Sequence, residues 1–379
     1  MVKVSGGSRV KKCDVLVVGG GPTGLTCAVE AARAGADVTL IDENRRPGGQ
    51  LFKQIHKFFG SGQHKAGVRG FDIGIELLEE VTRLGVNTLL NAVASGIFDD
   101  KTVGIVQDEK TGMIQGKKIL LATGAIENAV VFPGWTLPGV MGAGAAQTMI
   151  NIHRVLPGQR FVVLGSGNVG LIIGYQLLQA GADVTAVVEA APKIGGYQVH
   201  ASKIRRAGVP ILTSSTIKEV EGDREVEKVI TVKLDNSWKP IKGTERTLAA
   251  DCVCIAAGLH PSIELAQMAG CNLGFFSELG GRLPLHNESM ETTVDGIYIA
   301  GDTAGVEEAS TAMEEGRLAG IDMAERLGYL SEDRAIKAKK RVMESLCSLR
   351  SGPFGQACYR AKLNIIQTMR VDRGGKVLS

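Results

Sequence analysis

The chain has 379 residues, of which 44% are hydrophobic, only 4% are aromatic, and 50 are glycine. This length suits two or three domains, and an excess of glycine is typical of α/β domains, where tight turns and close approach to phosphates require it. The net charge of +3, from 43 basic and 40 acidic residues, gives no reason to expect nucleic acid or an acidic substrate as a partner.

No apolar run reaches the length of a membrane-spanning helix, and residues 1–12 lack the apolar core of a signal peptide, so we expect a cytoplasmic protein. The seven cysteines are an odd number, and no two of them form a C-x-x-C pair. A disulfide framework or a metal site is therefore not expected.

The first predicted elements are a strand over residues 15–18, a helix over 25–33 and a second strand over 38–41. In the loop Gly19-x-Gly21-x-x-Gly24, the first glycine allows the tight turn, the second lets N–H groups approach a pyrophosphate, and the third lets helix and strand pack closely. Asp42 follows the second strand directly, with Glu43 beside it, and an acid at this position can accept a hydrogen bond from a ribose hydroxyl. The alternative is a glycine-rich turn that holds no ligand.

The same pattern recurs about 145 residues later. A buried strand over 119–122 ends in Thr123-Gly124, and Pro-Gly pairs at 133–134 and 138–139 mark a crossing between domains. A strand over 160–164, the loop Gly165–Gly170, a helix over 171–180 and a strand over 184–188 then lead to Glu189. An acid there favours NAD over NADP, whose 2′-phosphate it would repel. The alternatives are an adenine nucleotide or no ligand.

Two further strands, over 252–255 and 296–299, end near Gly258 and at Gly301-Asp302. We therefore predict a discontinuous first domain, 1–135 and 282–330, with a second domain, 136–281, inserted into it. Asp302 is either a ligand-binding acid or a helix cap. A helix is expected over 310–327.

The last segment, 331–379, is predicted to be a helical extension, broken at 351–353, with 11 Lys and Arg against 4 Asp and Glu. Its basic side chains either dock on a partner or an anionic surface, or form a solvated helical face.

These motifs in this order, together with Gly48-Gly49-Gln50-Leu51, resemble the flavoproteins with two dinucleotide-binding domains that are related to thioredoxin reductase. The resemblance covers roughly residues 12 to 330. It implies an α/β fold with two Rossmann-like domains and an FAD held by Gly19, Gly21, Pro22, Thr23, Gly24, Asp42, Glu43, Gly49, Gln50, Leu51, Thr123, Gly124, Gly301 and Asp302. It also implies a second nucleotide, NAD or another adenine nucleotide, held by Gly165, Gly167, Asn168, Val169, Gly170, Glu189 and Gly258.

The sequence departs from disulfide reductases of this class, which carry a C-x-x-C beside the flavin. Residues 48–53 and 141–144 contain no cysteine, and Cys252 and Cys254 lie on a predicted buried strand. A dithiol relay from flavin to substrate is therefore excluded. None of the six histidines has a partner at a recognisable catalytic spacing, so no catalytic base is assigned and the chemistry is expected to belong to the cofactor.

A narrower resemblance rests on residues 121–125 with 131–141, and on 257–261 with 264–271. These segments are similar to the alpha-type subunits of heterotetrameric sarcosine oxidase, opine oxidases, hydrogen cyanide synthase and dye-linked proline or hydroxyproline dehydrogenases. The resemblance implies a partner subunit of the amino-acid-oxidase type that oxidises the substrate with its own flavin. The extension has only two cysteines, so an iron–sulfur cluster would come from another polypeptide.

These observations favour an FAD-binding electron-transfer subunit of a heteromeric amino- or imino-acid dehydrogenase or oxidase. The resemblance favours secondary amines such as proline, hydroxyproline or sarcosine. Two alternatives are a self-sufficient NADH-dependent reductase and a flavin-loaded scaffold that is not catalytic.

Overall fold

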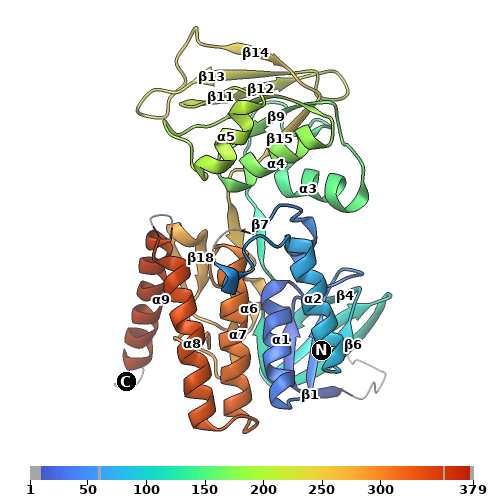
Figure 1. Cartoon of the computed structure of the whole chain (residues 1–379), viewed down its shortest axis with the longest axis vertical. Helices are drawn as coiled ribbons and strands as arrows, with labels where there is room; N and C mark the ends of the chain where they lie inside the picture. Colours follow the sequence, from blue (N-terminus) through green and yellow to red (C-terminus); the bar gives the residue numbers. More distant parts are fainter. Residues whose placement is uncertain (1–9, 59–60, 353–354, 376–379) are drawn as a thin grey trace, which may run out of the picture. The chain divides into compact units, whose positions relative to one another are not determined.

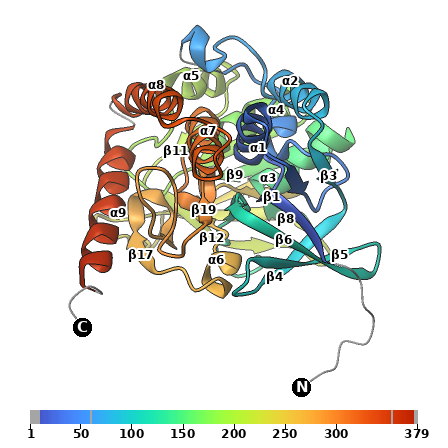
Figure 2. The ribbon, with the colours of Figure 1, turned by 90° about the horizontal axis from the view of Figure 1, so that it is seen from below.

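The computed structural model describes residues 10–58, 61–352 and 355–375. The chain forms two compact units: unit 1, residues 1–126 and 260–379, and unit 2, residues 127–259. Each unit is built on a mainly parallel sheet with helices, as Figures 1 and 2 show. The predicted α/β class with two Rossmann-like domains and a helical extension is confirmed.

Unit 1 is built on a seven-stranded sheet with the order β3-β2-β1-β6-β5-β4, in which β19 also pairs with β6. Strand β6 carries both partners because it is long: its first half forms a hairpin with β5, and its last three residues lie parallel to β19. The strands are β1 (Lys11–Val18), β2 (Val38–Ile41), β3 (Asn87–Leu89), β4 (Ala92–Ile97), β5 (Thr102–Gln107), β6 (Lys110–Leu121) and β19 (Ile297–Ile299).

The parallel strands of unit 1 place the ends of β1, β2, β6 and β19 at one edge of the sheet, because Val18 is paired with Ile41 and Leu121, and Leu121 with Ile299. The central strand residues are fully buried, as expected for a parallel sheet covered on both faces. Unit 1 also contains helix α2 (Gly70–Arg83) and several short elements: η1 (Gly49–Lys53), η2 (Gly62–His64), α6 (Glu264–Met268), β17 (Leu273–Phe276), η4 (Ser277–Leu279), β18 (Gly281–Pro284) and η5 (Gly301–Ala304). Strands β7 (Ala125–Glu127) and β16 (Leu259–Pro261) lie where the chain crosses between the units.

Helices α1 (Pro22–Ala34) and α7 (Ala309–Arg326) lie side by side in unit 1, although almost 300 residues separate them (Figure 1). Glycines of α7 allow this approach: a Cβ at Gly316 would lie 2.2 Å from the carbonyl oxygen of Thr23, and a Cβ at Gly320 would lie 2.7 Å from that of Cys27. The hydroxyl of Thr26 donates to the carbonyl of Met313 at 3.0 Å. The close contact fixes α7 against the start of α1.

The extension consists of α8 (Glu332–Arg350) and α9 (Gln356–Gly375); α8 packs on α7, and α9 packs on α8 and η4 (Figure 2). The predicted break between the helices is present, but Pro353 falls outside the described residues. We expected residues 260–281 in the inserted domain and 331–379 as a separate extension. Both segments belong to unit 1, since α6 packs on β4 and α8 on α7.

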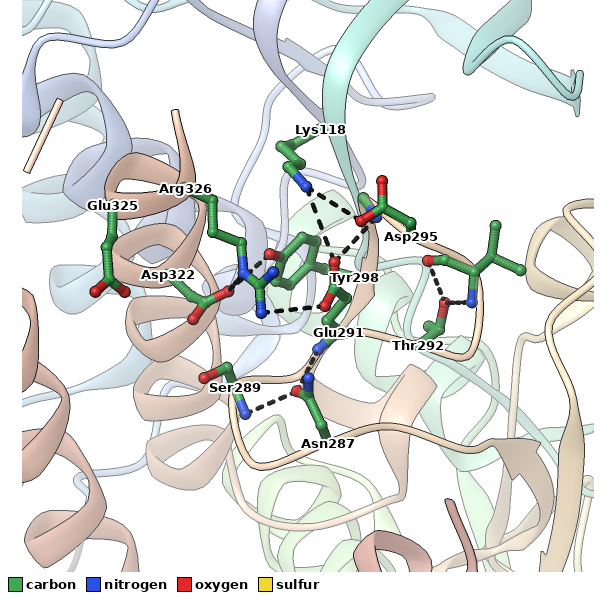
Figure 3. A network of polar contacts seen from close by, with 12 residues as sticks. Lys118, Asn287, Ser289, Glu291, Thr292, Asp295, Tyr298, Asp322, Glu325 and Arg326 are labelled. Carbon is green, nitrogen blue, oxygen red and sulfur yellow. Dashed lines mark hydrogen bonds and ion pairs between the residues drawn. The ribbon is translucent and has the colours of Figure 1, made fainter. Parts of the chain in front are cut away.

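A polar network ties the start of β19 to α7 (Figure 3). The buried hydroxyl of Tyr298 donates to Asp322 Oδ2 at 2.7 Å, and Arg326 Nε donates to the same oxygen at 2.8 Å. Glu291 accepts a hydrogen bond from Gly296 N at 3.0 Å and forms an ion pair with Arg326 at 3.3 Å. Glu291 and Gly296 precede β19 and Tyr298 is its middle residue, so the network anchors this strand to α7.

Unit 2 has a five-stranded parallel sheet with the order β11-β10-β9-β15-β8 and a three-stranded antiparallel sheet, β12-β13-β14. Its helices α3, α4 and α5 belong with the parallel sheet, and a single π-helical turn, η3, follows α3. The elements are β8 (Val140–Gly142), α3 (Ala143–Thr148), η3 (Met149–His153), β9 (Arg160–Leu164), α4 (Asn168–Gln179), β10 (Asp183–Val188), α5 (Gln198–Arg206), β11 (Ile211–Leu212), β12 (Ser215–Glu221), β13 (Lys228–Lys233), β14 (Arg246–Ala249) and β15 (Cys252–Ile255).

Among the helices of the described residues, none combines the length and the apolar character that crossing a membrane requires.

Candidate functional site: two glycine-rich loops

The first loop joins β1 to α1 and depends on glycine at two places. Gly19 has φ of +103°, and a Cβ there would lie 2.2 Å from the carbonyl oxygen of Ala122. A Cβ at Gly24 would lie 1.9 Å from the carbonyl oxygen of Gly19. Both glycines are therefore required by the packing of loop, helix and strand, as the sequence pattern predicts.

Gly21 is different, because no atom lies within 4 Å of the place where its Cβ would be. It is the N-cap of α1; no side chain caps the helix, and the next residue is Pro22, which has no N–H to satisfy. The start of the helix thus offers free N–H groups and a partial positive charge beside open space. This arrangement fits a pyrophosphate.

Asp42 follows β2 and is buried with its carboxylate turned toward the loop. Oδ2 accepts a hydrogen bond from Gly20 N at 2.7 Å, and Oδ1 accepts two from Asn44, through N at 2.8 Å and Nδ2 at 3.0 Å. A carboxylate has about four acceptor positions, so roughly one remains for a ribose hydroxyl. Glu43 is exposed. The main role of Asp42 in the described residues is to hold the loop.

The glycine pair at 48–49 lies against this loop. Gly48 N donates to the carbonyl of Gly20 at 2.6 Å, and Gly49, with φ of +49°, would bring a Cβ within 3.0 Å of Gly21 Cα. Gln50 is exposed on η1. Leu51 has no exposed surface and packs in the core, so its side chain supports the turn and offers nothing to a ligand.

The segments 123–124 and 301–303 also meet at this edge of the sheet. Gly124 N donates to the hydroxyl oxygen of Thr303 at 2.8 Å, and the hydroxyls of Thr123 and Thr303 are 3.3 Å apart. A Cβ at Gly301 would lie 2.1 Å from Thr23 Oγ1. The fold thus brings together predicted residues from four distant segments of unit 1, with Thr303 as a member that the sequence reasoning missed.

Asp302 is the titratable group of this cluster. Burial is the main reason that its pKa rises to about 6 from the usual 3.8, and the negative charges of Glu315 and Glu307 add to the rise while Lys362 opposes it. A carboxyl with this pKa can accept or donate a hydrogen bond near neutral pH. It therefore suits a hydroxyl-bearing ligand chain.

The second loop, in unit 2, repeats the contacts of the first. Gly165 has φ of +108°, and its Cβ would lie 2.2 Å from the carbonyl oxygen of Ala256; that of Gly170 would lie 2.1 Å from the carbonyl oxygen of Gly165. The space beside Gly167, the N-cap of α4, is open, and no side chain caps the helix. The second loop therefore fits a pyrophosphate as well as the first does.

Glu189 holds the second loop as Asp42 holds the first. Its Oε2 accepts from Ser166 N at 2.8 Å and from Ser166 Oγ at 2.6 Å, and its Oε1 accepts from Ala191 N at 2.8 Å. About one acceptor position is left for a ribose hydroxyl. Beside the loop, Val169 is exposed, and Gly258 is exposed with φ of +91°.

A second glycine pair, Gly195-Gly196, covers the second loop and was missed by the sequence reasoning. Gly196 N donates to the carbonyl of Ser166 at 2.8 Å, as Gly48 N does to Gly20. The side chain of Asn168 is directed to the same segment and accepts from Tyr197 N at 2.8 Å. The signal was available in the sequence, since a Gly-Gly pair follows the acidic strand end in both units.

The cysteines form no disulfide, and five of the seven are buried. All seven are free; Cys252 and Cys254 are buried on β15, and burial raises the pKa of the Cys252 thiol to about 11 and that of Cys254 further. The start of α3, residues 143–144, instead meets a carboxylate: Glu127 Oε1 accepts from Gly144 N at 2.6 Å. Among the described residues, no group of His, Cys, Asp and Glu side chains is arranged to hold a metal ion.

Comparison with known proteins places this geometry in a family. The model of the family described as "Pyridine nucleotide-disulphide oxidoreductase" matches residues 13–316. An opine oxidase subunit from Agrobacterium tumefaciens is 29% identical over 93% of this chain and 74% of its own length. Hydrogen cyanide synthase subunit HcnB of Pseudomonas aeruginosa is 28% identical over 91% of this chain and 78% of its own.

Two solved structures show the same fold. L-proline dehydrogenase from P. horikoshii aligns with a TM-score of 0.66 and 24% identity over 89% of this chain. This chain spans only 60% of that one. Thioredoxin reductase from T. acidophilum aligns with a TM-score of 0.69 and 19% identity over 84% of this chain and 99% of its own.

Proposed function

This chain belongs to the pyridine nucleotide-disulphide oxidoreductase family, and from that premise we propose that it is the FAD-binding electron-transfer subunit of an amino- or imino-acid dehydrogenase or oxidase complex. It is an FAD-dependent oxidoreductase. The relatives that support the finer assignment are named as subunits of opine oxidase and hydrogen cyanide synthase. The favoured substrates are secondary amines such as proline, hydroxyproline or sarcosine, oxidised by an amino-acid-oxidase-like partner subunit.

The observation that carries the proposal is the pair of matched loops, together with the lack of a dithiol in the two segments where disulfide reductases of this class carry one. Each loop has an open N-cap glycine, Gly21 or Gly167, and each is held by one acid. Residues 48–53 and 141–144, where a dithiol would be needed, contain none. Electrons therefore pass between nucleotides and a partner, and not through cysteines of this chain.

In this assignment the first loop holds the FAD. The N–H groups after Gly21 bind the pyrophosphate, Asp42 supports the loop and accepts a ribose hydroxyl, and Asp302 binds the ribityl chain or the phosphate. Gly49-Gln50 and Thr123-Gly124 line the flavin side. The flavin would supply electron and hydride transfer when bound, and the chain would position it. The second loop holds NAD, with Glu189 at the ribose.

The test compares electron donors under anaerobic conditions. The purified chain alone is mixed with NADH, and the complex with the polypeptide encoded beside it is mixed with proline, hydroxyproline or sarcosine, while the flavin absorbance is followed. Bleaching of the complex by an imino or secondary amino acid supports the proposal, whether or not NADH also reduces the isolated chain. Rapid bleaching of the isolated chain by NADH, with no amino-acid activity in any complex, overturns it.

That second outcome would identify a self-sufficient NADH-dependent reductase. The observation in its favour is the second loop, whose contacts match those of the first and whose acid, Glu189, suits NAD. A Gly167→Ala variant is the control, because it should remove the reduction by NADH in either case and leave the first loop intact.

A further inference from the structure

The extension sends two basic side chains into the interior of unit 1. Arg350, the last residue of α8, is 7% exposed, and Lys362, on α9, is 3% exposed. Sequence reasoning offered a docking surface or a solvated face for the basic side chains of this segment; these two form neither. Charged side chains are seldom buried this deeply without a specific partner.

The partner of both cations is Glu315, which is 1% exposed on α7. Lys362 Nζ donates to Glu315 Oε1 at 2.7 Å, and Arg350 donates to the same oxygen at 2.5 Å. Arg350 also forms a two-pronged contact with Glu307, with Nε donating to Oε1 at 3.0 Å. Burial opposes ionisation of Glu315, but the positive charges of Lys362 and Arg350 outweigh it and lower the pKa of this carboxyl.

The network contacts both ends of the Gly301–Ala304 turn at the first nucleotide site. Glu315 Oε2 accepts a hydrogen bond from Gly301 N at 2.9 Å, at the start of the turn. Lys362 Nζ donates to the carbonyl of Ala304 at 3.0 Å, at its end. Between these two contacts lie Asp302 and Thr303, and the hydroxyl of Thr303 contacts Thr123 and Gly124.

The distribution of charge around the turn also indicates a role for these two cations. Three carboxyls, those of Asp302, Glu307 and Glu315, surround the turn, and an FAD would add the negative charge of its pyrophosphate. Arg350 and Lys362 are the cations that the hydrogen-bond network places among them. Buried ion pairs are weak devices for stability alone, because desolvation offsets much of their attraction. The contact of Lys362 with Ala304, and that of Glu315 with Gly301, indicate a different role for this cluster.

We propose that Lys362 and Arg350 are positioning residues for FAD: through Glu315, and through the contact of Lys362 with Ala304, they hold the Gly301–Ala304 turn in its binding conformation. The C-terminal helices thus complete a site whose other parts come from earlier in the chain. This inference rests on the proposed binding of FAD by unit 1.

The test uses the full chain with Lys362→Met and, as a matched control, Arg360→Met, which removes an exposed cation from the same helix. FAD is removed and added back, and its dissociation constant, the midpoint potential of the bound flavin and the melting temperature of the FAD-free protein are measured. Losing a hydrogen bond from a charged donor should raise the dissociation constant of Lys362→Met about tenfold. Its potential should become more negative, since the positive charge of Lys362 beside the Gly301–Ala304 turn is lost. Arg360→Met should match the wild type.

A second variant keeps the inference testable if Lys362→Met does not fold. Glu315→Gln/Lys362→Met leaves no unpaired charge, since Arg350 keeps Glu307, and the Gln side chain can still accept from Gly301 N. It should fold and bind FAD at least several times more weakly. Either variant with the wild-type dissociation constant and potential overturns the inference, even if its melting temperature falls. A wild-type chain that binds no FAD overturns the proposed function as well, so the two failures are distinguishable.

Discussion

The substitution Gly21→Ala separates binding of a nucleotide from stability of the fold. Gly21 has φ of −69° and ψ of −175°, which alanine adopts freely, and its Cβ would meet no atom within 4 Å. Replacing glycine at a compatible conformation stabilises a protein by about 0.4–1 kcal/mol, whereas alanine as an N-cap costs roughly the same amount. The melting temperature of the FAD-free protein should therefore stay within about 4 °C of the wild type.

The same methyl group occupies the space through which the N–H groups of α1 approach the pyrophosphate. We expect FAD affinity to fall at least about 100-fold, which corresponds to about 2.7 kcal/mol. The assay is the ratio of flavin to protein absorbance after purification, followed by titration of the FAD-free protein with FAD. Differential scanning fluorimetry without FAD gives the stability.

Gly24→Ala is the matched comparison within the same loop. Its Cβ would lie 1.9 Å from the carbonyl oxygen of Gly19, so helix and strand must move apart, at a cost of about 1–3 kcal/mol. This variant should lose stability without FAD, which Gly21→Ala should not. The reasoning is refuted if Gly21→Ala binds FAD within threefold of the wild type, or if it is destabilised as much as Gly24→Ala.

Three further predictions follow from the same contacts. Gly167→Ala should retain FAD but lose reduction by NADH, since the open space at the second loop is filled; unchanged reduction would exclude NAD from that loop. Asp302→Asn should stabilise the FAD-free protein by roughly 1–2 kcal/mol above pH 6, because burial raises the pKa of the wild-type carboxyl to about 6 from 3.8 and its ionisation opposes folding. That gain in stability should vanish as the pH falls to about 4. Urea unfolding curves of both proteins at several pH values measure it, and a gain that does not depend on pH would contradict this reasoning. Tyr298→Phe removes a buried 2.7 Å hydrogen bond to Asp322 and should cost about 1–3 kcal/mol of stability. FAD affinity should be unchanged, because Asp322 lies about two turns along α7 from Glu315, the residue of that helix that contacts Gly301; weaker binding would place the network of Figure 3 in the site.

The features that sequence reasoning located are those with a local cause. Strand β2 coincides with the predicted 38–41, and helices α1 and α4 begin a few residues before the predicted spans because Pro22 and Asn168 follow their N-cap glycines directly. Gly19 and Gly165 have the left-handed conformation that the loop pattern requires. Each depends on only a few neighbouring residues, so the pattern suffices.

The features that sequence reasoning missed depend on contacts between residues that are far apart in the chain. Nothing near residue 51 shows that Leu51 is fully buried, and nothing near Asp42 shows that its Oδ2 accepts a hydrogen bond from Gly20. The boundary of the inserted unit also depended on which sheet residues 260–281 pack against.

The sequence by itself determined that this protein has two glycine-rich strand–loop–helix units with an acid after each second strand, because backbone conformation and strand pairing there are local properties. The tertiary structure alone decided which residues surround each loop. It joined Thr23 to Gly301 and placed Glu315, Arg350 and Lys362 behind the turn at 301–304. The basic composition of the last segment could not reveal this, because the burial of a charge depends on the partner that the fold brings to it.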